Sequence, residues 1–260
     1  MKTVTGIFNS RADAERAITN LRSLGIPDDR LNLLAPGETP REIEDEVPTT
    51  ETEQPGMGQA LGGTVGGAIG VAGGMHLGTA LASLFVPGVG PIFAAGLIAA
   101  ALLGAGGAAA GIAAGEALED AVAPELPHDE LFVYEDALRK GRSVVIAVAE
   151  TDEQAAAALN ALYEAGAESL DAARENWWVG LRDAEEEEYT RLGRDFKTDE
   201  AHYRRGFEAA LHPRVRGKSY DESADYLRER HAELYTGDAF RYGYQRGQTY
   251  HQSLQEKYKR

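Results

Sequence analysis

Two stretches decide the fold: Ser10-Arg-Ala-Asp-Ala-Glu-Arg-Ala-Ile-Thr-Asn-Leu-Arg-Ser-Leu-Gly25, and Thr151-Asp-Glu-Gln-Ala-Ala-Ala-Ala-Leu-Asn-Ala-Leu-Tyr-Glu-Ala-Gly166. Each begins with a residue whose hydroxyl can cap a helix, and apolar residues then follow at helical spacing. Each ends in a glycine, the residue best suited to a left-handed helix C-cap. The two stretches therefore predict two equivalent helices in separate parts of the chain.

Segments that suit β-strands flank both predicted helices. Residues Thr3–Phe8 and Leu31–Leu34 surround the first helix, and Val144–Ala149 precede the second. Residues Glu168–Ala172 are predicted as a further strand. Two β-α-β halves, at residues 1–36 and 124–181, predict an α+β fold of the ferredoxin-like βαββαβ type.

The chain between these halves contains a long run without charge. An acidic linker at residues 37–56 leads into it, and Gln54 to Gly115 hold 62 consecutive residues without Asp, Glu, Lys or Arg. Within it, Gly58–Val86 and Pro91–Gly115 are apolar and are joined by a Pro- and Gly-rich connection. This pattern predicts an inserted Gly/Ala-rich helical hairpin at residues 57–123.

Glycines recur at every fourth position of this run. Since residues four apart share a helix face, such strips allow close backbone contact between helices. We expect helix packing and homo-oligomerisation through this glycine zipper, and a polar stripe at i, i+3 and i+7 that suits interhelical hydrogen bonds or a proton-responsive site. The predicted packing residues are Gly58, Gly62, Gly66, Gly70, Gly74, Gly78, Gly107, Gly111 and Gly115; the stripe is His76, Thr79 and Ser83.

Both predicted arms are long enough for a membrane. As helices they would extend roughly 37–44 Å, against a hydrocarbon core of about 30 Å. Residues between Arg41 and Arg139 include no Lys or Arg, so a positive-inside signal is lacking. We expect inner-membrane association and lipid contact, with both αβ halves and the tail cytoplasmic. A hairpin buried in a soluble cytoplasmic oligomer and low-complexity disorder remain alternatives.

Charge and aromatic residues divide the chain near Trp178–Asp183. The formal net charge of −16 lies entirely in residues 1–181, whereas residues 182–260 are neutral and hold 9 of the 11 Tyr. This region contains two related phrases, Tyr203-Arg-Arg-Gly-Phe207 and Phe240-Arg-Tyr-Gly-Tyr244. We expect a helical tail domain with an aromatic core and a possible protein-partner surface. Nucleic-acid binding by these phrases is the weaker alternative, because neutrality gives little electrostatic attraction.

No motif predicts catalysis, a cofactor or a metal site. The chain contains no Cys, and Leu103–Gly111 has glycines but lacks the preceding strand of a dinucleotide-binding loop. Glu185–Glu188 are predicted as a solvated helix face. Glu208 and His212 are four residues apart, but Pro213 indicates that the helix ends there.

Three parts of the chain resemble bacterial stress proteins. Residues 3–36, with Gly-Ile-Phe-Asn-Ser, and residues 131–172, with Tyr-Glu-Asp-Ala-Leu-Arg-Lys-Gly, resemble the two halves of the heat-induced general stress protein domain. The tail is similar to a repeat-bearing tail of predicted stress proteins, in which the aromatic positions are more often occupied by Trp. The resemblance implies induction under stress and supplies no active site.

Together these features predict a non-enzymatic, stress-associated structural protein. It would self-assemble and associate with the membrane through its glycine-zipper hairpin. A soluble, oligomeric, ligand-binding regulatory module is the first alternative, and a nucleic-acid-binding protein is the second.

Overall fold

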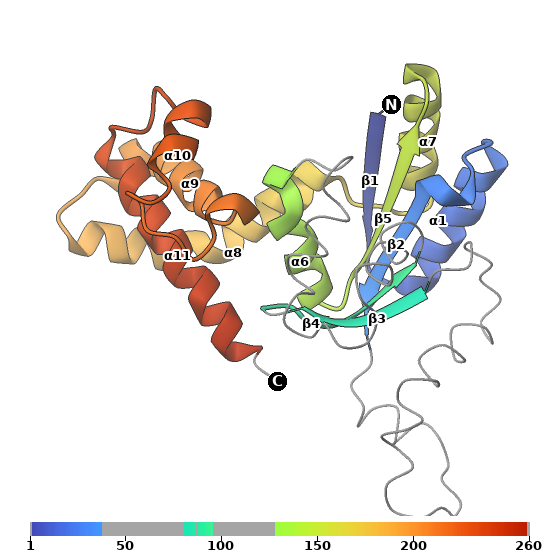
Figure 1. The fold of residues 1–260 in the computed structure, drawn as a ribbon, viewed down its shortest axis with the longest axis horizontal. Helices are drawn as coiled ribbons and strands as arrows, with labels where there is room; N and C mark the ends of the chain where they lie inside the picture. Colours follow the sequence, from blue (N-terminus) through green and yellow to red (C-terminus); the bar gives the residue numbers. More distant parts are fainter. Residues whose placement is uncertain (1, 38–80, 87, 96–127, 259–260) are drawn as a thin grey trace, which may run out of the picture. The chain divides into compact units, whose positions relative to one another are not determined.

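The computed structural model describes residues 2–37, 81–86, 88–95 and 128–258, and it is a mixed α+β structure (Figure 1). Its residues form two compact units. We call residues 1–126 and 137–170 the sheet unit, and residues 127–136 and 171–260 the helical unit.

The sheet unit contains a five-stranded antiparallel sheet with the order β1-β5-β2-β4-β3. Helix α1 connects β1 to β2, and α7 follows β5. These elements are β1 (Lys2–Phe8), α1 (Arg11–Ser23), η1 (Asp28–Arg30), β2 (Leu31–Pro36), β3 (Leu81–Val86), β4 (Gly90–Ala95), β5 (Ser143–Ala149) and α7 (Asp152–Glu164).

The two helix predictions from the repeated stretches are confirmed, including their ends. The Ser10 hydroxyl accepts a hydrogen bond from the Asp13 amide at 3.1 Å, and Thr151 caps α7 through Gln154 in the same way. Gly25 and Gly166 follow the two helices with φ of +79° and +93°. Local sequence therefore determines where both helices begin and end.

Apolar residues line both faces of the sheet. On one face, α1 and α7 pack through residues such as Ile18 and Leu162 against Val145 and its neighbours (Figure 1). Residues of the opposite face are also buried: Ile7, Leu34, Ile92, Val144, Ile146 and Val148 are each at most 3% exposed. The sheet thus behaves as a central layer, with apolar side chains directed to both sides.

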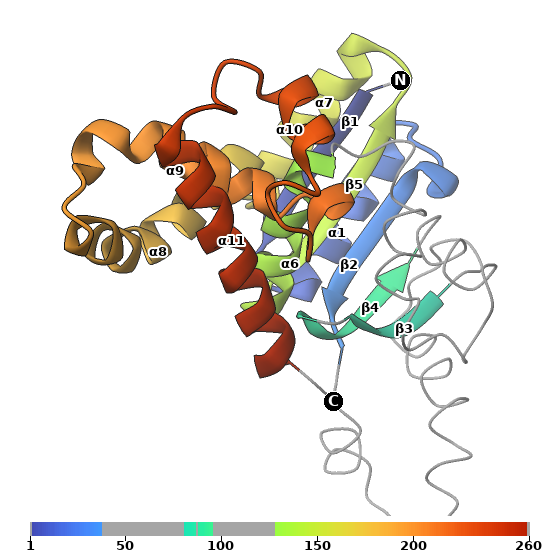
Figure 2. The same ribbon diagram turned by 60° about the vertical axis from the view of Figure 1, so that its left-hand side comes forward.

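The helical hairpin predicted at 57–123 is wrong where the structure describes it. Residues 81–86 and 90–95 form an antiparallel β-hairpin, and β4 pairs with β2 inside the sheet (Figure 2). The predicted turn between the arms is confirmed, with positive φ at Gly88 and Gly90. Apolar and aromatic residues on both sides of a glycine turn favour a hairpin when an existing strand offers main-chain partners.

The strand predicted at Glu168–Ala172 is largely wrong. Only Glu168 pairs, with its main chain exchanging two hydrogen bonds with Ile7 at 3.1 and 2.8 Å. Helix α8 (Leu170–Arg191) begins two residues later. Strand pairing therefore ends where the long aromatic-bearing helix starts.

The division of the chain also differs from the predicted boundary near Trp178–Asp183. Helix α8 continues through that region, and the units separate between Leu170 and Asp171. The reason is packing, because Trp177 and Trp178 are 2% and 1% exposed within the helical unit. The shift in charge follows the surface of α8, while the boundary follows the aromatic core.

The helical unit confirms that the tail is helical. Its aromatic core includes Trp178, Tyr189, Tyr203, Phe207, Phe240 and Tyr244, each at most 1% exposed. None of the helices in the described part of the chain combines the length and hydropathy needed to cross a bilayer. The elements are η3 (His128–Glu130), α6 (Leu131–Arg139, shared with the sheet unit), α8, α9 (Phe196–Ala210), η4 (Pro213–Val215), α10 (Ala224–Arg230) and α11 (Asp238–Lys257).

Candidate functional site

All the predicted packing glycines, and two of the three residues of the polar stripe, lie outside the described residues: Gly58, Gly62, Gly66, Gly70, Gly74, Gly78, Gly107, Gly111 and Gly115, with His76 and Thr79. The exception is Ser83, which lies in β3. Ser83 is therefore not part of a helix, contrary to the prediction of a helical polar stripe.

The described part of the charge-free run is fixed by main-chain contacts. The Gly37 amide donates to the Pro91 carbonyl at 2.9 Å, immediately after β2 ends. At the hairpin turn, the Arg139 guanidinium donates to the Gly88 carbonyl at 3.0 Å. The Arg11 guanidinium lies 4.3 Å from the centre of the Phe93 ring, a cation–π contact. These contacts attach the centre of the run to a folded sheet.

Strand β3 forms the outer edge of this sheet among the described strands (Figure 2). Pro91 directs its carbonyl towards β2, so its missing N–H does not interrupt pairing with β3. Along a strand, the main-chain N–H and C=O groups of successive residues point to opposite sides. Those of Ile92 and of its partner Leu84 therefore point towards each other, between β4 and β3. The main-chain groups of Leu81, Ser83 and Phe85 therefore point away from the sheet.

A small-residue helix contact does occur in this chain, but in the helical unit. Helices α9 and α11 cross at Gly206, Gly243 and Gly247. A Cβ on Gly206 would overlap the Phe240 carbonyl, and one on Gly247 would lie 2.5 Å from the Phe207 carbonyl oxygen. The two backbones thus touch where side chains are absent, the geometry associated with small-xxx-small contacts.

These glycines are the functional residues that the sequence prediction missed. Gly206 and Gly243 occupy the same position in the two related phrases, 37 residues apart, and Gly247 follows four residues later. The repeat was visible, but the phrases were interpreted through their aromatic and arginine residues. An aromatic–Arg–x–Gly–aromatic pattern on two predicted helices was the available signal for a mutual crossing.

A buried carboxylate connects three helices beside this crossing. Glu185 of α8 accepts a hydrogen bond from the Tyr203 hydroxyl at 2.6 Å, and two from the Arg246 guanidinium at 2.8 and 2.9 Å. Its exposed fraction is 6%, so the prediction that the whole Glu185–Glu188 stretch is solvated is wrong at its first residue. The physical reason is that Arg246 compensates the buried negative charge.

This arrangement changes the proton affinity of both partners. Burial raises the pKa of Tyr203, and the adjacent Glu185 carboxylate raises it further. The hydrogen bonds to Glu185 raise the pKa of Arg246. Tyr203 therefore stays a neutral donor and Arg246 stays a cation across the physiological range, which suits a structural role.

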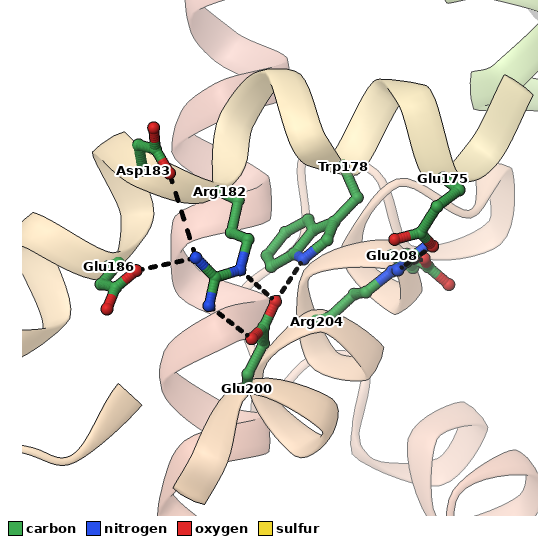
Figure 3. A network of polar contacts seen from close by, with 8 residues as sticks. All are labelled: Glu175, Trp178, Arg182, Asp183, Glu186, Glu200, Arg204 and Glu208. Atoms are coloured by element: carbon green, nitrogen blue, oxygen red, sulfur yellow. Dashed lines mark hydrogen bonds and ion pairs between the residues drawn. The ribbon is translucent and has the colours of Figure 1, made fainter. Parts of the chain in front are cut away.

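A second ionic network joins other residues of α8 to α9 (Figure 3). The Arg182 guanidinium binds both carboxylate oxygens of Glu200, at 2.8 and 2.9 Å, and the Trp178 indole N–H donates to the same carboxylate at 3.0 Å. The hydrogen bond from Arg182 lowers the pKa of Glu200. Nearby, Arg204 pairs with Glu175 and Glu208. The network connects α8 to α9.

A buried amide holds the loop after α9. The Gln248 side chain donates to the carbonyls of Ala210 and Val215 at 3.3 and 2.9 Å, and it accepts from the Gly217 amide at 2.8 Å. The Tyr244 hydroxyl adds a hydrogen bond to Lys218 O at 3.1 Å. All of these side chains are engaged in fixing the backbone of the unit.

The metal-ligand candidates of the sequence can be examined only in the described residues. No group of three potential His, Cys, Asp or Glu ligands comes together among them. Glu208 pairs with Arg204, while His212 Nδ1 accepts from the Arg214 amide, so this pair does not form the considered ligand site. The Gly-rich stretch at residues 103–111 lies outside the described residues.

Four of the five aromatic residues in the two related phrases are unable to stack on bases, whereas Tyr242 is partly exposed. Tyr203, Phe207, Phe240 and Tyr244 of the two phrases have no exposed surface and form the core, as the favoured interpretation of the tail expected. A groove of about 530 Å³ beside the start of α11 is lined by charges of both signs, including Arg194, Asp199 and Asp238. The carboxylates of Asp199, Glu233 and Asp238 outnumber the one guanidinium of this lining, so the groove offers no attraction for the phosphates of a nucleic acid.

Comparison of the chain with models of protein families, with characterised proteins and with solved structures gave no match. The resemblance to the general stress protein domain therefore stays a prediction.

Proposed function

We propose that this chain is a non-catalytic, self-assembling structural protein whose charge-free run is the assembly element. The observation that carries the proposal is the β3–β4 hairpin. Through this hairpin the centre of the run is part of the sheet. Its strand β3, Leu81-Ala-Ser-Leu-Phe-Val86, is the outermost of the described strands and contains no charged residue and no proline. Such an edge is a template for pairing with another chain unless it is covered or charged.

The connection of the strands supports a ferredoxin-like domain as the platform. Strands β1 and β2 are both antiparallel to β5, which lies between them, and α1 connects them. Strand β5 and Glu168, joined through α7, lie on either side of β1. This interleaving of two strand–helix–strand halves supports the proposal of a βαββαβ sandwich, to which β3 and β4 are added beside β2.

Membrane association stays part of the proposal only in a restricted form. Because β2 and β3 lie in one sheet, the chain between them must begin and end on the same side of a bilayer. The uncharged part of that connection, residues 54–80, has 27 residues, whereas two crossings need about 40. We therefore propose contact with one membrane surface instead of the spanning hairpin expected from the sequence.

Stress association enters through the resemblance alone. It predicts that the amount of protein in its native cells rises after heat or another general stress. Quantitative mass spectrometry of stressed and unstressed cells measures this directly, and equal amounts under all stresses would remove this part of the proposal.

Self-assembly is tested with the full-length protein in the absence of detergent. Sedimentation velocity over a range of concentrations should show reversible association. A single monomeric species throughout would reject the proposed function. Flotation with anionic and with neutral vesicles tests surface contact separately, and a protein that stays at the bottom of both gradients would remove the membrane part.

A further inference from the structure

We infer that two copies of this chain join through their β3 strands, which pair antiparallel about a twofold axis at Ser83. The inference rests on the proposed self-assembly and names the surface that performs it. The partner is a second copy, and the product is one continuous sheet across both copies.

The backbone geometry of β3 suits this pairing. The main-chain groups that point away from β4 belong to three residues, Leu81, Ser83 and Phe85. Ser83 is the middle one, so the set is symmetric about it. A twofold axis at Ser83 places Leu81 opposite Phe85 of the other copy, and Ser83 opposite Ser83. Each of these pairs exchanges two main-chain hydrogen bonds, so every outward group of the strand obtains a partner. An interface with this self-complementary arrangement closes on itself as a dimer.

Charge favours a second copy at this place. The chain carries a net charge of −16, so two copies repel each other over most approaches. Residues 81–86 lie inside the run of 62 residues without a charged side chain. Pairing of β3 with its copy therefore places no charged side chain of the strand itself against a like charge.

The proposed axis predicts a specific response to charge at position 83. In either S83K or S83E, the substituted side chain meets its own copy directly across the axis, where opposite residues have Cβ atoms about 4.5–5.5 Å apart. Each variant alone should dimerise about tenfold more weakly or worse, because like charges are juxtaposed. An equimolar mixture of the two should recover association, because Lys then faces Glu.

Sedimentation equilibrium of the full-length variants and their mixture tests this. The control S23K adds the same charge at the exposed last residue of α1 and should leave the dissociation constant within about twofold of the starting protein. Far-UV circular dichroism establishes that each variant is folded. Hydrogen exchange of the unsubstituted protein provides a second measurement: the amides of Leu81, Ser83 and Phe85 should become more protected as concentration rises.

The outcomes separate the inference from the proposed function. If the unsubstituted protein is always monomeric, self-assembly itself is rejected. If it associates but S83K and S83E associate equally well, the assembly uses another surface and the β3 inference is overturned. Weakened variants whose mixture does not recover, or outward amides whose protection ignores concentration, overturn the inference as well.

Discussion

Glu185 shows how strongly the helical unit depends on a single carboxylate. Replacing it by Gln removes the charge that compensates Arg246 while keeping nearly the same shape. We expect E185Q to lower the free energy of unfolding by about 1–3 kcal/mol, because a partly buried cation loses its partner. E187Q, at an exposed position of the same acidic stretch, should change it by less than about 0.5 kcal/mol.

Urea unfolding followed by tryptophan fluorescence compares the two variants, since Trp177 and Trp178 both lie in the same unit. Equal effects of the two substitutions would show that Glu185 contributes no more than a surface acid.

Buried tyrosines give the helical unit a predicted sensitivity to alkaline pH. Burial raises the pKa of Tyr203 and raises those of Tyr220 and Tyr226 to about 12. A raised pKa in the folded state means that the unfolded chain releases its proton first. The contribution of these tyrosines to the stability of the folded state is therefore fully present below about pH 10, the ordinary tyrosine pKa. It is lost as pH rises above that value.

The free energy of unfolding should therefore decrease between about pH 9 and about pH 12, a range that includes the ordinary tyrosine pKa of roughly 10. In Y203F the decline should be shallower than in the unsubstituted protein, because one titrating hydroxyl is gone. An identical slope would contradict the assignment of this loss to Tyr203.

The crossing of helices α9 and α11 requires residues without a side chain at the positions where the two backbones touch. G206A places a methyl group against the Phe240 carbonyl, and we expect it to destabilise the protein by about 1–3 kcal/mol. Gly180 lies within α8 with open space around its missing side chain, so G180A should stabilise by up to about 1 kcal/mol. Thermal unfolding of both variants checks the opposite signs; a stabilising G206A would contradict the close crossing.

Elements governed by local sequence were predictable, and those governed by distant partners were not. Ser10 and Thr151 are followed by helices because their caps act within one turn. Leu81–Val86 was predicted as helix because its apolar residues fit either structure, and pairing with β4 decides between them. Apolar composition alone does not show whether a partner strand is within reach.

The candidate sites show the same limit. Helical periodicity predicted glycine contacts within the charge-free run, whose packing glycines lie outside the described residues, and it did not predict the glycine contact between α9 and α11. Glu185 was assigned to a solvated stretch because its neighbours are acidic, and its partner Arg246 is 61 residues away in the chain. A buried ion pair of this kind leaves no local pattern.

For the whole molecule, net charge sets the response of assembly to salt. Two chains of charge −16 repel, and salt reduces that repulsion. Between about 0.01 M and 0.15 M salt the Debye length falls from about 30 to about 8 Å, so association through the uncharged edge should strengthen. Sedimentation at both concentrations measures this, and weaker association at the higher salt would point to an interface made of ion pairs.

The pairing of β4 with β2 makes the centre of the charge-free run part of the sheet. The chain has no Cys, so L34C/A94C introduces the only two thiols, at positions that face each other across β2 and β4. Leu34 and Ala94 form a pair without mutual main-chain hydrogen bonds, whose Cα atoms are about 4.5 Å apart, within disulfide reach. In L34C/A95C the second thiol lies one residue further, on the opposite face of the sheet.

Mild oxidation of the folded full-length protein, followed by peptide mass spectrometry, is the most direct test. We expect an intramolecular disulfide in L34C/A94C and free thiols in L34C/A95C. Two free thiols in both variants, or equal crosslinking in both, would contradict the pairing of β2 with β4.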